Sequence, residues 1–106
     1  MNLQLDECID RRLARELTGH SVKTVPQMGW AGINNGNLLS LAESQFDVFI
    51  SVDRNLSFQQ NLPKFNIAVF VLQALTNKLT DLQPLAPKIL AELPNAKAGD
   101  VTMITS

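Results

Sequence analysis

Cysteine is nearly absent from this chain of 106 residues, which contains only Cys8. One cysteine cannot form an internal disulfide, and a protein without disulfides is typical of a reducing cytosol. Cys8 also has no second cysteine with which to bind a metal or exchange thiols, so we expect it to be a small buried residue. The cysteine content therefore favours a cytoplasmic protein.

Long apolar segments are also missing. No stretch of the sequence approaches the ~20 apolar residues that a membrane-spanning helix needs. The N-terminal residues, MNLQLDECID, contain no basic segment followed by a long apolar one, as a secretory signal would. We therefore expect a soluble cytoplasmic protein that does not act in a membrane.

Neither sign of charge predominates, since nine Lys and Arg residues face ten Asp and Glu residues and the formal net charge is −1. This balance argues against a protein that coats nucleic acid through bulk charge, so a polyanion would have to be held by a local cluster. The glycines form no nucleotide-binding loop, because GWAGINNG has the spacing of neither a P-loop nor a dinucleotide-binding fingerprint. A hydrophobic fraction of 45% supports one core, and we expect a single domain over residues 1–106.

The sequence does contain short apolar runs that alternate with amphipathic patterns. Strands are expected at residues 2–5, 22–25, 46–52, 67–72 and 101–104, with helical patterns at residues 9–17, 38–46 and 82–93. The last helix is expected to begin or bend near Pro84, because proline fits only the first turn of a helix. The run FDVFISV alternates little, as a parallel strand covered on both faces does. We predict an α/β fold, a three-layer α/β/α sandwich with a mostly parallel sheet of about five strands.

Acidic residues follow two of the expected strands. Asp6 and Glu7 come after the first strand, and Asp53 follows the third. In open α/β sheets, the ends of such strands meet at the switch point where ligands bind. Clustered carboxylates repel one another, and a hard divalent ion such as Mg²⁺ or Mn²⁺ relieves this repulsion. We therefore predict a metal site with Asp6 and Asp53 as catalytic ligands, Glu7 beside them, and Asn37 and Asn55 as neutral oxygen ligands. The simpler alternative for Asp53 is a residue that opens a turn or caps the next helix.

Basic residues are expected near the same rim of the sheet, where planar guanidinium groups suit phosphate recognition. Arg11 and Arg15 share a face of the expected helix at i, i+4, whereas Arg12 can pair with Glu16. The alternative interpretation is a solvated helix face. The candidates for holding an RNA backbone are Arg11, Arg12, Arg15, Arg54 and Lys78.

The order of short motifs along the chain points to a family. These are LDE near the N-terminus, then R-x-L-A, G-H-x-V, the loop MGWAGINNGNLLSLAE, the strand FDVFISVDRNL, then QQNL and TNKL. Together they resemble the compact bacterial PIN-like proteins related to PilT N-terminal nucleases, over nearly the whole chain. Such proteins are often the toxin halves of type II toxin–antitoxin pairs. The resemblance implies an α/β/α sandwich, cleavage of RNA that depends on a divalent metal, and a small antitoxin partner with a DNA-binding domain.

The acids of the family carry over to Asp6, with Glu7 beside it, and to Asp53. The sequence departs from the family at Asn37, where relatives often have an acid, and at Asn55, where many have the second acid of an Asp-x-Asp. Fewer negative charges weaken metal binding. A second hypothesis is therefore a catalytically weak PIN-like module that binds an antitoxin and RNA, and a homo-oligomer remains open.

A third hypothesis is a phospho-receiver domain. The acids after the first strand, Asp53 after the third and Thr76 after the fourth match the plan of that family. A receiver also calls for a lysine just after the fifth strand, where this sequence reads Thr105-Ser106. We rank this hypothesis below the other two.

Overall fold

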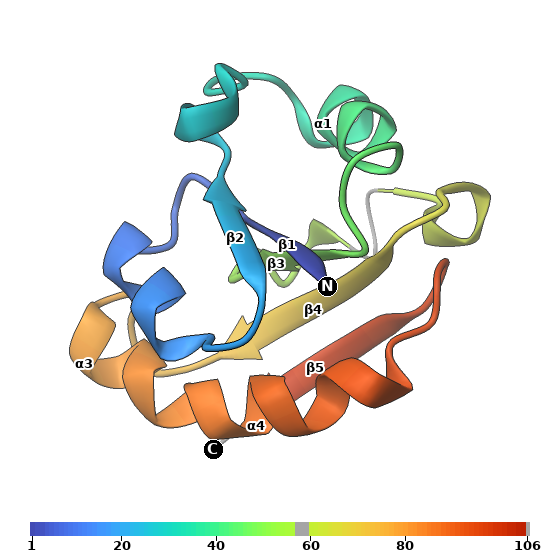
Figure 1. Cartoon of the computed structure of the whole chain (residues 1–106). Coiled ribbons are helices and arrows are strands. Elements are labelled where there is room, and N and C mark those ends of the chain that lie inside the picture. The colour runs from blue at the N-terminus through green and yellow to red at the C-terminus, as the bar shows by residue number, and fades with distance from the viewer. Residues whose placement is uncertain (57–59, 106) are drawn as a thin grey trace.

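A computed structural model describes residues 1–56 and 60–105 (Figure 1). Its centre is a sheet of five strands that are all parallel, in the order β2-β1-β3-β4-β5. The predicted α/β sandwich with about five strands is confirmed. This strand order occurs in several doubly wound folds, so the topology alone selects no function. The strands are β1 Asn2–Leu5, β2 Ser21–Thr24, β3 Val48–Ser51, β4 Ala68–Gln73 and β5 Val101–Thr105.

Helical segments cover both faces of the sheet. One face packs against the 3₁₀ helix η1 (Arg11–Glu16) and a C-terminal series made of α3 (Leu79–Leu82), η4 (Gln83–Leu85), α4 (Ala86–Glu92) and η5 (Leu93–Asn95). The opposite face packs against α1 (Asn35–Ala42) and the short 3₁₀ helices η2 (Pro26–Met28) and η3 (Leu62–Lys64). In Figure 1, α1 lies above the sheet and α3 and α4 lie below it. Within residues 1–56 and 60–105, no helix has the length and apolar character needed to cross a membrane.

The apolar runs of the central strands divide their side chains between the two faces. In β3, Val48 and Ile50 enter the core beneath α3 and α4, whereas Phe49 enters the core beneath α1. In β4, Phe70 joins the first core and Val71 joins the second. A strand buried on both faces needs apolar residues at successive positions. This explains why these runs lack alternation in the sequence.

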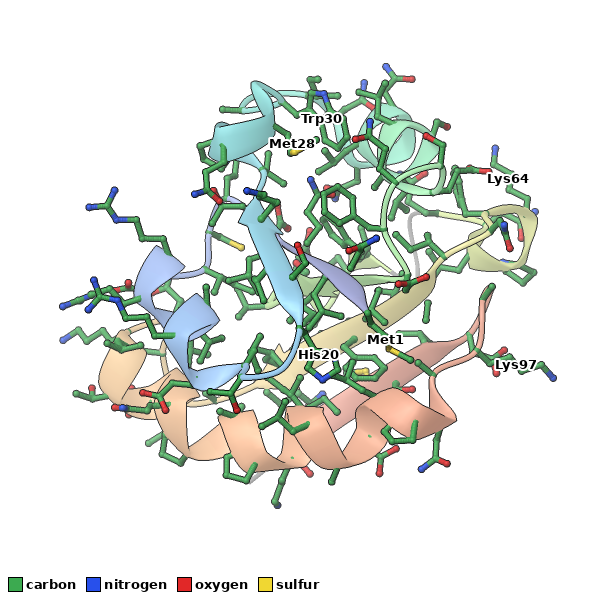
Figure 2. All side chains as sticks on the ribbon, viewed as in Figure 1. Met1, His20, Met28, Trp30, Lys64 and Lys97 are labelled. Carbon is green, nitrogen blue, oxygen red and sulfur yellow. The ribbon has the colours of Figure 1, made fainter. Side chains whose placement is uncertain are left out.

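The core beneath α1 is closed at one end by an aromatic pair. The rings of Trp30 and Phe46 meet edge to face with centroids 6.2 Å apart. Figure 2 shows Trp30 beside Met28 at the end of the molecule that carries η2 and α1. Both side chains are partly buried against this core. Trp30 therefore acts as a packing residue here.

Two helical predictions needed correction. The segment expected to be a helix at residues 9–17 is a six-residue 3₁₀ helix, whose first turn is capped by the side chain of Asp10. The segment expected at residues 82–93 is divided into α3, η4, α4 and η5. Pro84, Pro87 and Pro94 each stand in the first positions of a new segment, as expected for a residue that cannot continue a helix. The sequence LSFQQNL at residues 56–62, stopped by Pro63, predicts a short helical or irregular turn, and this segment lies partly outside the described residues.

One buried polar side chain leads to a prediction about stability. Gln4 in β1 is fully buried, and neither its amide oxygen nor its amide nitrogen has a hydrogen-bond partner among the described residues. Because burying unpaired polar groups costs free energy, Gln4→Leu should raise the free energy of unfolding by about 1–2 kcal/mol. Urea denaturation measures this change, with Gln45→Leu at an exposed position as the matched control. A lower stability of Gln4→Leu would contradict the account.

Candidate active site at the β1/β3 switch point

The two predicted acids lie at the ends of neighbouring strands. The chain leaves β1 toward β2 on one side and returns to β3 on the other, so the ends of β1 and β3 form the switch point of the sheet. Asp6 directly follows β1, and its backbone N–H donates to the carbonyl of Ile50 in β3 over 2.9 Å. Asp53 follows β3 by two residues. The structure thus brings Asp6 and Asp53 to the same rim, as the sequence predicted.

Ser51 connects these two acids. Its hydroxyl donates to Asp6 Oδ2 over 2.7 Å and accepts the backbone N–H of Asp53 over 3.0 Å. Ser51 is the last residue of β3 and is completely buried. Ser51 was not among the predicted site residues, although a hydroxyl residue at the end of an otherwise apolar strand is a signal. Ser51 fixes the orientation of the Asp6 carboxylate relative to the Asp53 backbone.

Asp6 is buried, with only 6% of the residue exposed, although charged residues usually lie at the surface. Burial raises its pKa above the ordinary value, and the charge of Glu7 adds to this increase. The hydrogen bonds from Ser51 and from the Glu7 backbone N–H, at 2.8 Å, oppose it. The net direction is upward. A nearby cation would favour the charged form and oppose this increase.

Asp53 is held by two groups from its own rim. Asn55 donates its backbone N–H to Asp53 Oδ1 over 2.9 Å, and the side-chain amide of Asn35 donates to Asp53 Oδ2 over 3.3 Å. Asn35 is the first residue of α1. The asparagine of α1 that contacts Asp53 is therefore Asn35, and not Asn37, which was predicted to lie at this site. Asn37 lies exposed in the first turn of α1, where its backbone N–H is capped by the side chain of Asn34 over 3.0 Å.

A hollow of about 490 Å³ opens beside Asp6 and Glu7, between the ends of β1 and β2. Glu7 lies on its wall and accepts the backbone N–H of Gly32 over 3.3 Å, which fixes the loop that precedes α1. Thr24 and Gln27 exchange hydrogen bonds on the opposite wall, at 2.8 and 3.2 Å. The hollow is lined by Asp6, Glu7, Ile9, Arg11, Thr24, Pro26 and Gln27. It combines two acids with one arginine, Arg11.

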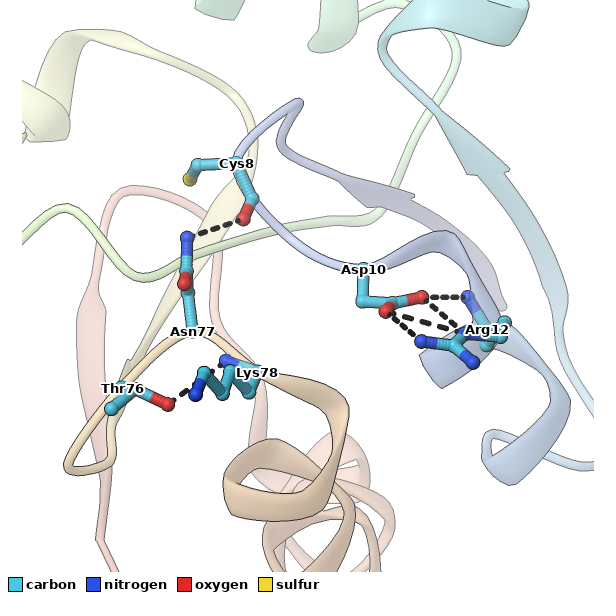
Figure 3. A network of polar contacts seen from close by, with 6 residues as sticks. All are labelled: Cys8, Asp10, Arg12, Thr76, Asn77 and Lys78. Atoms are coloured by element: carbon cyan, nitrogen blue, oxygen red, sulfur yellow. Dashed lines mark hydrogen bonds and ion pairs between the residues drawn. The ribbon is translucent and has the colours of Figure 1, made fainter.

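The basic residues divide into one that borders this hollow and others that do not. Arg12 pairs with Asp10 over 2.7 Å (Figure 3), so the expected pairing of Arg12 with Glu16 is wrong. The bonds from Arg12 hold the pKa of Asp10 below its ordinary value, at about 2. Glu16 instead accepts the amide of Gln83 over 2.7 Å. A 3₁₀ helix has three residues per turn, so Arg15 shares a side with Arg12 and not with Arg11.

Arg54 and Lys78 lie beyond the ends of β3 and β4. Arg54 lines a separate hollow of about 280 Å³ together with Thr76 and Asn77. Thr76 accepts the backbone N–H of Lys78 over 3.1 Å (Figure 3). Its hydroxyl also donates to Asp81 in α3, so Thr76 ties the residue before α3 to the helix. The Lys78 side chain is exposed. These hydrogen bonds give Thr76 a structural role, so its position after β4 can be explained without a phospho-receiver site.

Cys8 lies in the loop between β1 and η1, which contacts the segment after β4. The residue is exposed, so its expected burial is wrong. Its carbonyl accepts the side-chain amide of Asn77 over 3.2 Å (Figure 3). Partial shielding of the thiol, and then the charge of Asp6, raise the pKa of Cys8 and make the thiol a weaker nucleophile at neutral pH.

The donor set for a metal is small. Within residues 1–56 and 60–105, no group of three or more His, Cys, Asp or Glu residues is arranged to hold an ion. Mg²⁺ is commonly bound through one or two carboxylates, with waters and substrate phosphates completing its shell. The carboxylates of Asp6 and Asp53 fit that minimal requirement.

No family model, curated protein or solved structure matches the chain.

The raised pKa of Asp6 leads to a prediction about pH. Because the folded pKa lies above the unfolded value of 3.8, ionisation of Asp6 favours the unfolded chain. The resulting loss of folding stability develops as pH rises from 3.8 through the folded pKa. Asp6→Asn removes this cost while its amide oxygen still accepts the Ser51 hydroxyl. The variant should melt at a higher temperature than wild type at pH 7 in metal-free buffer. The difference should vanish as pH falls below 3.8. Parallel melting curves across pH measure both, and a difference independent of pH would contradict this electrostatic origin.

Proposed function

We propose that the chain is an endoribonuclease that depends on a divalent metal, and the toxin of a type II toxin–antitoxin system. The observation that carries this proposal is the convergence of Asp6 and Asp53 at the β1/β3 switch point, joined through Ser51. Ligands of open α/β sheets bind at this position. The motif resemblance to PIN-like nucleases supplies the substrate class and the expected partner, a small antitoxin with a DNA-binding domain.

The residues would divide the work as follows. Asp6 and Asp53 would hold Mg²⁺ or Mn²⁺, while Ser51 and Asn35 keep the two carboxylates in place. When bound, such an ion activates water and stabilises the in-line displacement at a phosphodiester. Arg11, on the wall of the adjacent hollow, would hold a phosphate of the RNA backbone. Arg12, already paired with Asp10, is less suited to this contact than Arg11.

RNA cleavage by the purified chain tests the proposal. Mixed RNAs should be cut in the presence of Mg²⁺ or Mn²⁺ and left intact when a chelator is added. The expected RNA fragments can be resolved by denaturing gel electrophoresis. An absence of cleavage with either metal, in a protein that is folded, would contradict the proposed nuclease.

A second candidate function is a PIN-like module that binds its antitoxin and RNA with little or no turnover. The observation that favours it is the small set of metal donors: in the part of the chain that the structure describes, no three acidic, His or Cys residues are arranged to hold an ion, and the neutral amide of Asn35 contacts Asp53. Strong binding to an antitoxin encoded beside it, together with inactivity toward RNA, would support this candidate. Robust metal-dependent cleavage would exclude it.

A further inference from the structure

β5 forms one edge of the sheet, and its outward main-chain groups have no strand partner among the described residues. The direction of these groups follows from the first bond to β4, in which Val69 donates its N–H to the carbonyl of Asp100 over 3.0 Å. Main-chain groups alternate in direction along a strand. The N–H and C=O groups of Val101, Met103 and Thr105 therefore point away from β4. Lys88 in α4 reaches the outward carbonyl of Thr105 over 2.6 Å, which agrees with this assignment.

This edge lacks the features by which proteins usually protect an edge strand. The five residues VTMIT include no charge and no proline, although charged residues and prolines commonly discourage pairing at such edges. The side chains of Val101 and Met103 are 39% and 43% exposed. The opposite edge, β2, carries the exposed Lys23 at its centre. β5 is therefore the edge that favours pairing with another strand.

The charges beside β5 indicate which strand would pair there. α4 is the return connection between two parallel strands and so runs antiparallel to β5, as Figure 1 shows. Lys88 lies near the Thr105 end of β5, and Glu92 lies one helical turn further toward the Val101 end. Both residues line a hollow of about 320 Å³ between α4 and β5, with the small exposed Ala91 between them.

We propose that a second copy of this chain binds the β5 edge through antiparallel pairing of the two β5 strands. A twofold axis at Met103 would place each Val101 opposite Thr105 of the other copy, and all three outward-pointing residues would then exchange main-chain hydrogen bonds. The same axis places Lys88 of each copy opposite Glu92 of the other. The positive Lys88 end of the face on one copy thus meets the negative Glu92 end on the other. The face is therefore self-complementary, as an isologous contact requires. The result is one continuous sheet of two copies, independent of the nuclease proposal.

A proline variant tests the strand pairing. Met103→Pro removes an outward N–H and leaves the hydrogen bonds of β5 to β4 in place, so the chain should keep its fold. Sedimentation equilibrium over a wide concentration range should show a dimer for the wild type. Met103→Pro should raise the dimer dissociation constant at least about 100-fold, because it blocks the pairing on both sides of the axis. A wild type that stays monomeric, or a dimer that survives this variant, would overturn the proposal.

A charge exchange tests the orientation of the two copies. Lys88→Glu and Glu92→Lys should each weaken the dimer about 3- to 10-fold, because each places like charges opposite one another. The double variant should restore wild-type affinity, since the exchange recreates opposite charges across the axis. Lys23→Glu on the β2 edge is the matched control and should leave the dimer unchanged. Failure of the double variant to restore binding would overturn the antiparallel arrangement.

Discussion

Asp53→Asn is expected to reduce metal-dependent RNA cleavage by at least about 100-fold, which corresponds to about 2.7 kcal/mol in the activation barrier. The substitution keeps the size of the side chain and removes the negative charge of Asp53 from the β1/β3 rim. It also replaces an oxygen that now accepts the amide of Asn35. Initial rates of cleavage at saturating Mn²⁺ measure the effect.

Asp47→Asn is the matched control for this loss of activity. Asp47 precedes β3, at the opposite end of the strand from Asp53, where it accepts the backbone N–H of Asn2 over 2.8 Å. The control should retain wild-type rates if its melting temperature stays close to that of the wild type. Equal cleavage by Asp53→Asn and wild type would point to a contaminating nuclease and would reject Asp53 as a catalytic ligand.

Phe49→Ala should produce the largest loss of stability. Phe49 lies at the centre of β3, is fully buried, and fills the core between the sheet and α1. Removing such a ring leaves a cavity that costs about 3–5 kcal/mol. Small domains are stable by only about 5–15 kcal/mol, so much of the chain's stability would be lost.

Urea denaturation followed by circular dichroism measures this loss, with Leu75→Ala as the control. Leu75 is 95% exposed, and its truncation should leave the midpoint unchanged. A loss below about 1 kcal/mol for Phe49→Ala would show that the core beneath α1 is loosely packed, contrary to the structure.

The fold was largely predictable because its strands are buried on both faces. The runs at Val48–Ser51 and Ala68–Gln73 contain almost only apolar residues, as a strand does when both faces of its sheet are covered. Asp6 and Asp53 follow β1 and β3, and the ends of parallel strands lie at the same edge of a sheet, so both acids had to lie on one rim. The bend predicted near Pro84 corresponds to the change from α3 to η4, whereas the further breaks near Pro87 and Pro94 were not predicted. The predicted features depend on local patterns that a single sequence reveals.

The details of the rim depend on contacts between residues far apart in the chain, and these were not predictable. The bond from Ser51 to Asp6 joins residues from different strands, and Asn35 reaches Asp53 from the start of α1. Arg12 could bond either to Asp10, two residues before it, or to Glu16, four residues after it. The 3₁₀ geometry of η1 favours Asp10. Sequence spacing indicates which residues share a rim but does not determine which atoms meet there.

The most direct test of the metal site is broadening of backbone amide NMR signals by Mn²⁺. A paramagnetic ion held by Asp6 and Asp53 should broaden the amide signals of Asp6, Glu7 and Asp53 first and leave those of β5 sharp. Asp6→Asn and Asp53→Asn should each abolish this pattern, whereas Asp47→Asn should preserve it. The same broadening in all of these variants, or broadening centred elsewhere, would contradict a metal site at the β1/β3 switch point.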